Sequence, residues 1–480
     1  MKKTGLFKII MFILLGMVVA TWIFSAGYFN ETEVVAVDMY NVGFFDFFAL
    51  IIGAFEFEYF IQILILLVSI GALYGVLNKT GKYRAWIEKI AKNMKGQELV
   101  FLIVVAFVIT ALTTMFDYEF SLFIFFPLLI SIILAMGYDK VTAALTTFGS
   151  VLIGTIGNIK GDTVTSTIIE LLDTEMTTNM LYFKLALAFL SFIALIFFLS
   201  KAKRTRKTAE DLENEDRFIG EKVSTKYSAA PIIIAFALMF VILVLACTNW
   251  SDTFGIKFFE NLHNSITTAE IKLPYFHIAP DGIDAGTQKV AIFSKILGTF
   301  SAFGKWHFIE MAILCLFTSV VLGLIYRIKG IFQAMADGAK KMLAPAFMVL
   351  FAYTVIYFAG SQMFYPTIAA IILSISSKFS VILSTIVVGL GSTLFVDILY
   401  VANYLIPQIS AISGATPTLV TLLIQGVYGV TMFVAPTSAL LVLALTYLEI
   451  PYKEWIKRTW KLILVLLAIV VGILLIAKFI

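Results

Sequence analysis

Carboxylates, hydroxyls and amides lie inside long apolar runs of this chain, where protein rather than lipid must satisfy them. They gather in four short stretches: Thr113, Thr114, Asp117 and Glu119; Thr155 and Asn158; Ser392, Thr393 and Asp397; and Pro436, Thr437 and Ser438. Such oxygen atoms, with the backbone groups that a helix leaves unpaired where it stops, can bind small cations and polar solutes. We therefore take these residues as candidates for binding a substrate or an ion, and we expect none of them to be catalytic.

The acids are the costliest members of this set. A carboxylate at membrane depth costs roughly 2.5–3.5 kcal/mol on insertion scales, so it normally faces a cavity or a partner. Asp117 and Glu119 lie in the middle of one apolar run, and Asp397 holds the equivalent place in a later run. Three acids favour a cationic or zwitterionic solute, or a coupling cation. The alternative is that these turns reach the membrane surface, where water solvates the acids.

The stretches Gly154–Asn158 and Val434–Ser438 interrupt two further apolar segments with small and polar residues. Broken helices at corresponding positions of two halves are typical of the binding site of a secondary transporter. The simpler alternative at each stretch is a Gly or Pro kink packed against a neighbouring helix. The single amides Asn403 and Gln425 are better explained by hydrogen bonds between helices.

Composition indicates the solvent in which these elements must fold. Of 480 residues, 60% are hydrophobic and 14% are charged, and the mean hydropathy is +0.98. We predict an all-α polytopic membrane protein of the cell membrane. The net charge of +4 comes largely from short basic loops, so it indicates orientation and not nucleic-acid binding. No ATP-binding motif and no catalytic or metal-ligand spacing is present, so we expect neither an enzyme nor a metal site.

The basic loops predict which side of the membrane each segment faces. Lys and Arg cluster at residues 2–3, 79–95, 201–207, 327–341 and 453–461. The positive-inside rule places all five in the cytoplasm, with the N-terminus inside and the C-terminus outside. Segment 98–136 then begins and ends in the cytoplasm, and segment 379–412 begins and ends outside. We expect both to be hairpins whose turns, Thr113–Glu119 and Ser392–Asp397, lie inside the membrane.

Two units of opposite orientation follow from this topology. The first is residues 1–200, with hairpin 98–136 and broken helix 141–172. Residues 201–305 form a linker with a cytoplasmic loop, helix 230–249 and an outer loop. The second unit is residues 306–480, with an amphipathic piece at 330–341, helix 343–360, hairpin 379–412 and broken helix 416–447. We expect the stretches 81–96 and 361–378 to be interfacial arms that hold a scaffold still.

Three stretches resemble a known group of transporters. They are residues 42–60 with Gly43-Phe44-Phe45-Asp46, residues 113–139, and residues 435–455, which run from Ala435-Pro436-Thr437-Ser438 to Trp455. They are similar to the YfcC-like and C4-dicarboxylate anaerobic carrier group of the ion transporter superfamily. The resemblance implies two hairpins and two broken helices around one solute site, an elevator-type motion and a homodimer. It places Thr113, Thr114, Glu119, Asn158, Pro436, Thr437 and Ser438 at that site.

Residues and resemblance together predict a secondary active transporter for a small polar solute. We expect an amino acid, basic or zwitterionic, because of the three acids. The alternative is a C4-dicarboxylate or another carboxylate, carried as symport or antiport with sodium or protons. An ion channel would want a continuous polar lining, which the sequence lacks. The expected partners are the solute, the lipid bilayer and a second copy of the chain. The only cofactor expected is a coupling sodium ion or proton.

Overall fold

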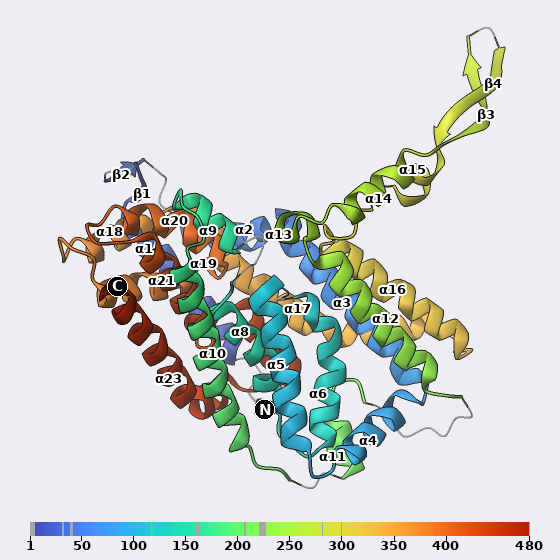
Figure 1. The fold of residues 1–480 in the computed structure, drawn as a ribbon, viewed down its shortest axis with the longest axis horizontal. Coiled ribbons are helices and arrows are strands. Elements are labelled where there is room, and N and C mark those ends of the chain that lie inside the picture. Colours follow the sequence, from blue (N-terminus) through green and yellow to red (C-terminus); the bar gives the residue numbers. More distant parts are fainter. Residues whose placement is uncertain are drawn as a thin grey trace.

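The computed structural model describes residues 5–30, 33–38, 42–116, 118, 120–159, 164–205, 208–219, 227–280, 282–298 and 300–479. This part of the chain is mostly helical (Figure 1). Eight of its helices are long and apolar enough to cross a membrane: α1, α3, α5, α10, α12, α16, α17 and α23. The prediction of a helical protein with many membrane spans is therefore confirmed.

The described residues up to residue 200 form ten α-helices, one pair of strands and short helical turns between them. Their bounds are α1 Gly5–Ile23, β1 Ala26–Phe29, β2 Val34–Val37, α2 Asp46–Gly53, the 3-10 turn Ala54–Glu56, α3 Glu58–Lys79, α4 Tyr83–Asn93, α5 Glu98–Phe116, the 3-10 turn Ser121–Phe125, α6 Phe126–Ala135, α7 Lys140–Ala144, the π-turn Leu145–Gly149, α8 Ser150–Ile156, α9 Val164–Leu171 and α10 Thr178–Ser200.

The remainder of the chain forms a middle section and a second set of long helices. The middle section contains α11 Ala209–Glu215, α12 Ala230–Cys247, α13 Trp250–Phe254, α14 Phe258–Thr267, β3 Glu270–Ala279, β4 Gly282–Ala291 and α15 Ile292–Leu297. The second set contains α16 Phe308–Ile325, α17 Ile331–Gln362, α18 Tyr365–Leu373, α19 Val381–Phe395, α20 Ile398–Ser410, α21 Pro417–Met432, α22 Ala439–Leu448 and α23 Tyr452–Phe479.

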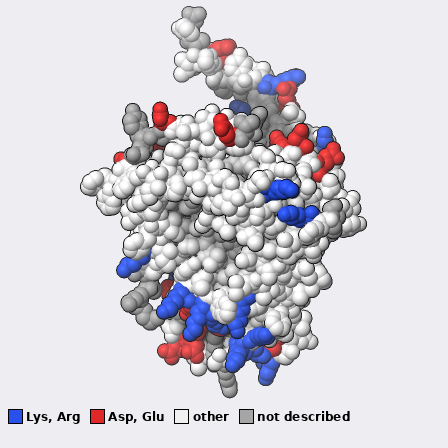
Figure 2. All heavy atoms as spheres, turned by 90° about the vertical axis from the view of Figure 1, so that its left-hand side faces the viewer, with Lys and Arg blue, Asp and Glu red and all other residues white. Residues whose placement is uncertain are grey.

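On the face shown in Figure 2, most charged side chains gather toward two ends, and the belt of surface between them is largely uncharged. We call the end that carries α4 and α11 the basic end, and the end from which β3 and β4 project the ribbon end (Figure 1). The belt is where lipid would lie, because charged side chains avoid hydrocarbon. Exposed side chains on α10 within the belt are apolar, as Phe189 and Phe197 illustrate.

Helices α3, α16 and α17 pack together as one layer of the fold. Small residues permit the tightest contact in this layer. A Cβ on Gly75 of α3 would lie 2.7 Å from the Cα of Gly338 on α17, closer than real Cβ atoms approach. Only glycine fits this crossing, as is common between membrane helices. We call α3, α16 and α17 the scaffold layer. Helices α19 of the second hairpin and α22 of the second broken helix pack against α17 of this layer.

Several elements differ from the predicted ones. The predicted amphipathic piece 330–341 and helix 343–360 are one helix, α17, which continues through Pro345. The expected all-α fold is wrong in the loops, because β1 pairs with β2 and β3 pairs with β4. The predicted outer loop of residues 250–305 contains α13, α14, α15 and the β3–β4 ribbon, which extends away from the helices (Figure 1).

The helices also run further into the predicted turns than expected. Thr113 and Thr114 belong to the last turn of α5, and Ser392 and Thr393 belong to α19. Gly154 and Thr155 likewise belong to α8, so the first break begins at Gly157. The stretch from Thr113 to Phe116 contains no Gly or Pro that would stop a helix earlier. Asp117 and Glu119 lie outside the described residues.

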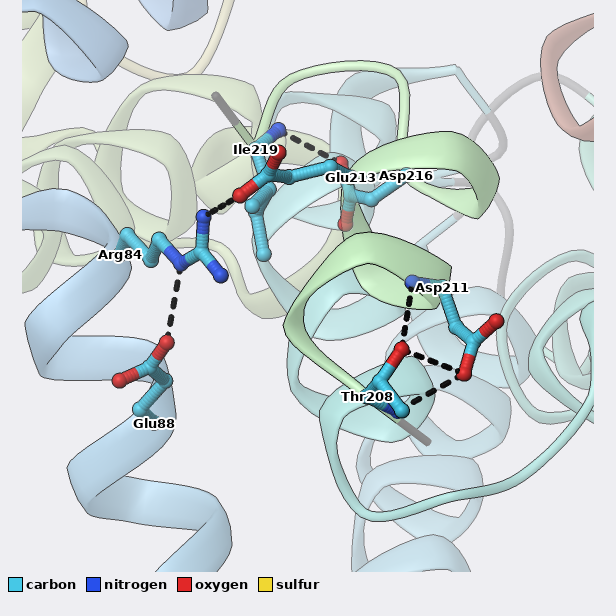
Figure 3. Close-up of polar contacts among 7 residues, drawn as sticks. All are labelled: Arg84, Glu88, Thr208, Asp211, Glu213, Asp216 and Ile219. Carbon is cyan, nitrogen blue, oxygen red and sulfur yellow. Dashed lines mark hydrogen bonds and ion pairs between the residues drawn. The ribbon is translucent and has the colours of Figure 1, made fainter. Parts of the chain in front are cut away.

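Residues 208–219 form a strap across the basic end (Figure 3). A capping box between Thr208 and Asp211 starts α11. Arg84 of α4 forms ion pairs with Glu88 and with Glu213 of the strap. Asp216 is buried and accepts hydrogen bonds from the backbone N–H groups of Phe218 and Ile219, at 2.8 and 3.0 Å. These contacts hold the segment between α10 and α12 against the helix ends.

Candidate functional site

A small cavity lies where the second hairpin, the second helix break and the scaffold layer meet. Its volume is about 30 Å³. It is lined by Tyr59, Phe120, Leu152, Tyr353, Val396, Asp397, Tyr428, Met432, Ser438, Ala439 and Leu440. Phe120 follows the tip of the first hairpin, and Leu152 belongs to the first broken helix. Residues from both hairpins and both broken helices thus border one space.

The turn of the second hairpin presents a carboxylate to this cavity. Asp397 is the N-cap of α20, and its Oδ1 accepts a hydrogen bond from the backbone N–H of Leu399 at 2.8 Å. The preceding residue, Val396, has a φ of 45°, which a β-branched residue rarely adopts. The hydroxyl of Tyr428 donates to the carbonyl of Val396 at 2.7 Å and holds it there. Backbone strain of this kind is concentrated at functional sites.

The second break is residues 433–438, between α21 and α22. The Thr437 hydroxyl donates to the carbonyl of Thr393 at 2.6 Å and so ties the break to the second hairpin. Ser438 lines the cavity and is the N-cap of α22. Pro436 lies between these elements and lacks a backbone donor. The break therefore brings the N-terminus of α22 to the cavity, close to that of α20.

Two aromatic side chains of α23 satisfy carbonyls that the second break exposes. The Trp455 Nε1–H donates to the carbonyl of Phe433 at 2.8 Å. The Tyr452 hydroxyl donates to the carbonyl of Val434. Both aromatic residues lie in the stretch that resembles the transporter group by sequence. Their role in this structure is to hold the interrupted backbone in one conformation.

The first break is fastened to the end of α5. The Ile159 backbone N–H donates to the carbonyl of Thr114 at 2.8 Å. The Asn158 Nδ2 donates to the carbonyl of Thr113 at 3.2 Å. A Cβ on Gly154 would lie 2.6 Å from the Cβ of Thr113, so only glycine permits this contact. The structure thus brings Thr113, Thr114 and Asn158 together, and their binding of a solute or an ion stays a prediction.

A buried polar cluster extends from this break to helices α9, α10 and α21. The Thr165 hydroxyl donates to Oδ1 of Asn158 at 2.9 Å. The same hydroxyl accepts from the Lys184 Nζ at 3.2 Å and from the Gln425 Nε2 at 3.1 Å. Lys184 and Gln425 are both 0% exposed. We call Asn158, Thr165, Lys184 and Gln425 the buried cluster.

Sequence reasoning missed Lys184 and Thr165. The available signal was a single lysine within the apolar segment 182–200, because a cation in a membrane segment is rare and usually functional. Two expected residues play smaller parts. The Ser392 hydroxyl donates to the carbonyl of Val388 in its own helix, and the Thr155 hydroxyl donates to that of Val151.

A second, larger cavity of about 250 Å³ lies beside the first. It is lined by Phe57, Phe60, Ile356, Tyr357, Gly360, Ser361, Tyr400 and Tyr404. Both cavities lie between α20 and the scaffold helices α3 and α17. The stacked rings of Phe60 and Tyr353, 4.2 Å apart, separate them. In the part of the chain that the structure describes, no group of three or more His, Cys, Asp or Glu could hold a metal ion.

The model of one protein family matches residues 4–479, almost the whole chain, and that family is described as the C4-dicarboxylate anaerobic carrier, DcuC. The chain belongs to this family. It is therefore a multi-pass membrane transporter of a small-molecule solute and not an enzyme. The predicted resemblance to the C4-dicarboxylate carrier group is confirmed, and membership of this family supports the predicted alternative substrate, a carboxylate, better than an amino acid.

Two further comparisons give weaker likenesses. An uncharacterized protein of Haemophilus influenzae is 26% identical over 95 residues, which is 20% of this chain and 19% of the relative. A solved structure, the YdaH transporter of Alcanivorax borkumensis, whose topology is described as unusual, aligns over 99% of this chain and 98% of its own. Its sequence identity is 16% and the TM-score is 0.44.

Proposed function

We propose that this DcuC-family chain carries a C4-dicarboxylate, or a similar small carboxylate, across the cell membrane by secondary active transport. The observation that carries the proposal is the cavity at which the N-termini of α20 and α22 meet. The N-terminus of a helix carries a partial positive charge and unpaired N–H groups, which favour carboxylates. The family description supports the same solute class.

The cavity is much smaller than its proposed solute. Solute pockets usually measure about 300–1,000 Å³, whereas this one measures about 30 Å³. Binding then requires the second hairpin to move away from the scaffold layer. The larger aromatic cavity between the same elements is the path that such a movement would widen.

We propose two inverted repeats as the basis of that movement. Each half contains a long helix pair, a hairpin, a broken helix and a final span, in the same order. In support, Arg204 pairs with Glu98 at the start of the first hairpin, near the basic end. In the second half, the Lys478 Nζ at the C-terminal end of α23 donates to the carbonyl of Phe379, just before the second hairpin. In both halves, a basic residue that follows or ends the final span thus contacts the start of the hairpin. The expected elevator-type motion, homodimer and coupling to sodium or protons belong to this proposal.

One observation favours a second candidate solute. The carboxylate of Asp397 lines the cavity and would attract an ammonium group, as in a basic or zwitterionic amino acid. With a carboxylate solute, the same acid would instead meet a coupling cation or carry a proton. The two candidates therefore differ in their need for a cation. An amino acid brings its own ammonium group to Asp397, whereas a carboxylate needs a coupling cation or a proton there.

Uptake by liposomes that contain the purified protein decides between the two. We expect radiolabelled succinate to accumulate and unlabelled fumarate or malate to compete with it. Radiolabelled lysine and alanine should not accumulate above the level in protein-free liposomes. Uptake of lysine or alanine, without uptake of succinate, would contradict the carboxylate proposal and support an amino acid carrier.

A further inference from the structure

Lys184 places a cation at the first helix break, inside the protein. It lies on the buried face of α10, and its Nζ contacts Thr165 in the first turn of α9. The next side chain along α10, Leu185, is exposed on the surface. The lysine thus points into the protein, toward the first break. Burial of its ammonium costs free energy, so the surrounding groups must compensate for the lost water.

The surroundings of Lys184 have the composition of a cation site. Oxygen atoms of the break and of α9 meet at the Thr165 hydroxyl, which accepts from the Lys184 Nζ and donates to Oδ1 and the carbonyl of Asn158. The helix from Lys140 to Ile156 ends at this break, so the negative end of its dipole points there. Unwound carbonyls and C-terminal helix ends are the groups with which transporters coordinate sodium.

The cluster also holds acceptors that the protein itself leaves unused. Oε1 of Gln425 and the hydroxyl of Thr113 are buried without a hydrogen-bond partner among the described residues. The backbone is close as well. A Cβ on Gly157 would lie 2.5 Å from the Cβ of Ala188, one turn along α10 from Lys184. Helix α10, which carries Lys184, therefore packs directly against the interrupted segment.

We infer that the ammonium of Lys184 fills a cation site at the first break, so that the chain supplies its own cation where a coupling sodium ion would otherwise bind. The consequence for ion coupling rests on the transport function proposed above. Transport would need no sodium ion at the first break. Any coupling ion would act at the second half of the site, where Asp397 lies.

Removal of the ammonium should leave the oxygen atoms of the buried cluster free to bind an added cation. We would purify the wild type, Lys184→Ala and the control Leu185→Ala, which alters the adjacent lipid-facing residue. Melting temperatures would be measured in choline chloride with added sodium or methylammonium. We expect Lys184→Ala to melt lower than the wild type and to gain at least about 2 °C from one of these cations, beyond any wild-type response. Leu185→Ala should respond as the wild type does.

One additional variant makes the test decisive. Thr165→Val in the Lys184→Ala background removes the hydroxyl oxygen of the proposed cation site. It should abolish the increase in melting temperature that an added cation gives. A Lys184→Ala protein no more responsive to cations than the wild type would overturn the inference. Because melting does not depend on which solute is carried, this result is separate from the uptake test.

If Lys184→Ala cannot be purified, charge and length can be separated by uptake. Lys184→Arg keeps a cation, whereas Lys184→Met keeps a similar length without charge. We expect Lys184→Met to lose at least about tenfold in uptake and Lys184→Arg to retain most of it. Equal uptake by the two variants, whether high or low, would overturn the inference.

Discussion

Asp397 has two roles that a single substitution can separate. Its Oδ1 caps α20, and its charge faces the cavity between the second hairpin and the scaffold layer. An asparagine retains a side-chain oxygen for the cap but not the charge. An alanine removes both. The pair of variants therefore distinguishes a structural acid from one that meets a cation or a solute.

The first prediction concerns this residue. Asp397→Asn should lower uptake by at least about tenfold with little change in melting temperature, because only the charge is lost. Asp397→Ala should in addition lose about 0.5–2 kcal/mol of unfolding free energy with the cap. Uptake and melting are measured on the same preparations. Wild-type uptake by Asp397→Asn would show that the carboxylate only caps the helix.

The second prediction concerns the two breaks. Asn158→Leu removes the side-chain link from the first break to α5, and Thr437→Val removes the hydroxyl link from the second break to Thr393. Each should reduce uptake while the protein still inserts into the membrane. Asn403→Leu is the matched control, because Asn403 is exposed and, among the described residues, donates within its own helix to the carbonyl of Leu399. Full uptake by both variants would contradict a site at the breaks.

The sequence identified these polar residues because lipid tolerates them only at special places. It did not identify Lys184, because the pattern of acids and helix breaks does not include a single lysine in an otherwise regular span. Nor did it predict the partners of the breaks. Trp455 and Tyr452 are distant in sequence from the carbonyls of Phe433 and Val434 that they satisfy, and only the fold shows these pairs.

At the scale of elements, the two broken helices cross at a single glycine. A Cβ on Gly429 of α21 would lie 2.5 Å from Cγ1 of Ile156 and 2.9 Å from its backbone nitrogen. The backbone of Ile156 is the last turn of α8, immediately before the first break. The crossing therefore sets the distance between the first break and α21, which carries Gln425.

The third prediction tests this crossing. Gly429→Val should lower the free energy of unfolding by about 1–3 kcal/mol, because the side chain forces α21 away from α8. The control is Gly472→Val on α23, where nothing lies within 4 Å of the added Cβ. Thermal unfolding of both variants provides the comparison. Equal melting temperatures for the two would contradict a tight crossing.

The fourth prediction concerns pH and the strap. Burial raises the pKa of Asp216 above its ordinary value of 3.8, although hydrogen bonds from Ser131, Phe218 and Ile219 oppose the rise. The folded protein then binds this proton more tightly than the unfolded chain. Stability should increase as pH falls through the raised pKa, and this gain is complete below 3.8.

Asp216→Asn isolates that contribution. The amide can still accept from the backbone N–H groups but cannot titrate. We expect the melting temperature of the wild type to rise relative to the variant as pH is lowered from about 7 toward about 4. Parallel curves for the two proteins would show that Asp216 does not titrate in this range.

Hydropathy predicted the long spans well because the bilayer sets their length. It could not predict that α17 continues through Pro345, since a proline usually ends a soluble helix but is tolerated where neighbouring helices support the backbone. The β3–β4 ribbon was missed for a local reason. Pro274 lies within β3 and weakens the strand pattern.

At the scale of the whole molecule, the distribution of charge gives the clearest orientation signal. Lys and Arg gather at the end that carries α4 and α11 (Figure 2), and from the positive-inside rule we expect that end to face the cytoplasm. The ribbon would then lie outside the cell. Cysteine labelling tests this, since Cys315 is buried and both native cysteines can be replaced.

The fifth prediction uses one lysine from each end. Lys92→Cys on α4 and Lys272→Cys on β3 are both exposed positions. In intact cells, a membrane-impermeant maleimide should label Lys272→Cys and not Lys92→Cys. Both should react once the cells are opened. The reverse pattern would show that the chain is inserted in the opposite orientation.

Arg217 of the strap links α22 of the second broken helix to α17 of the scaffold layer. Its guanidinium donates at 2.9 Å to the carbonyls of Thr446 and Tyr447, at the end of α22, and also to the carbonyl of Lys341 on α17. Displacement of α22 relative to α17 breaks at least one of these bonds. If transport moves α22 as proposed above, the strap would act as a latch that favours the closed conformation, and the solute would have to supply that free energy.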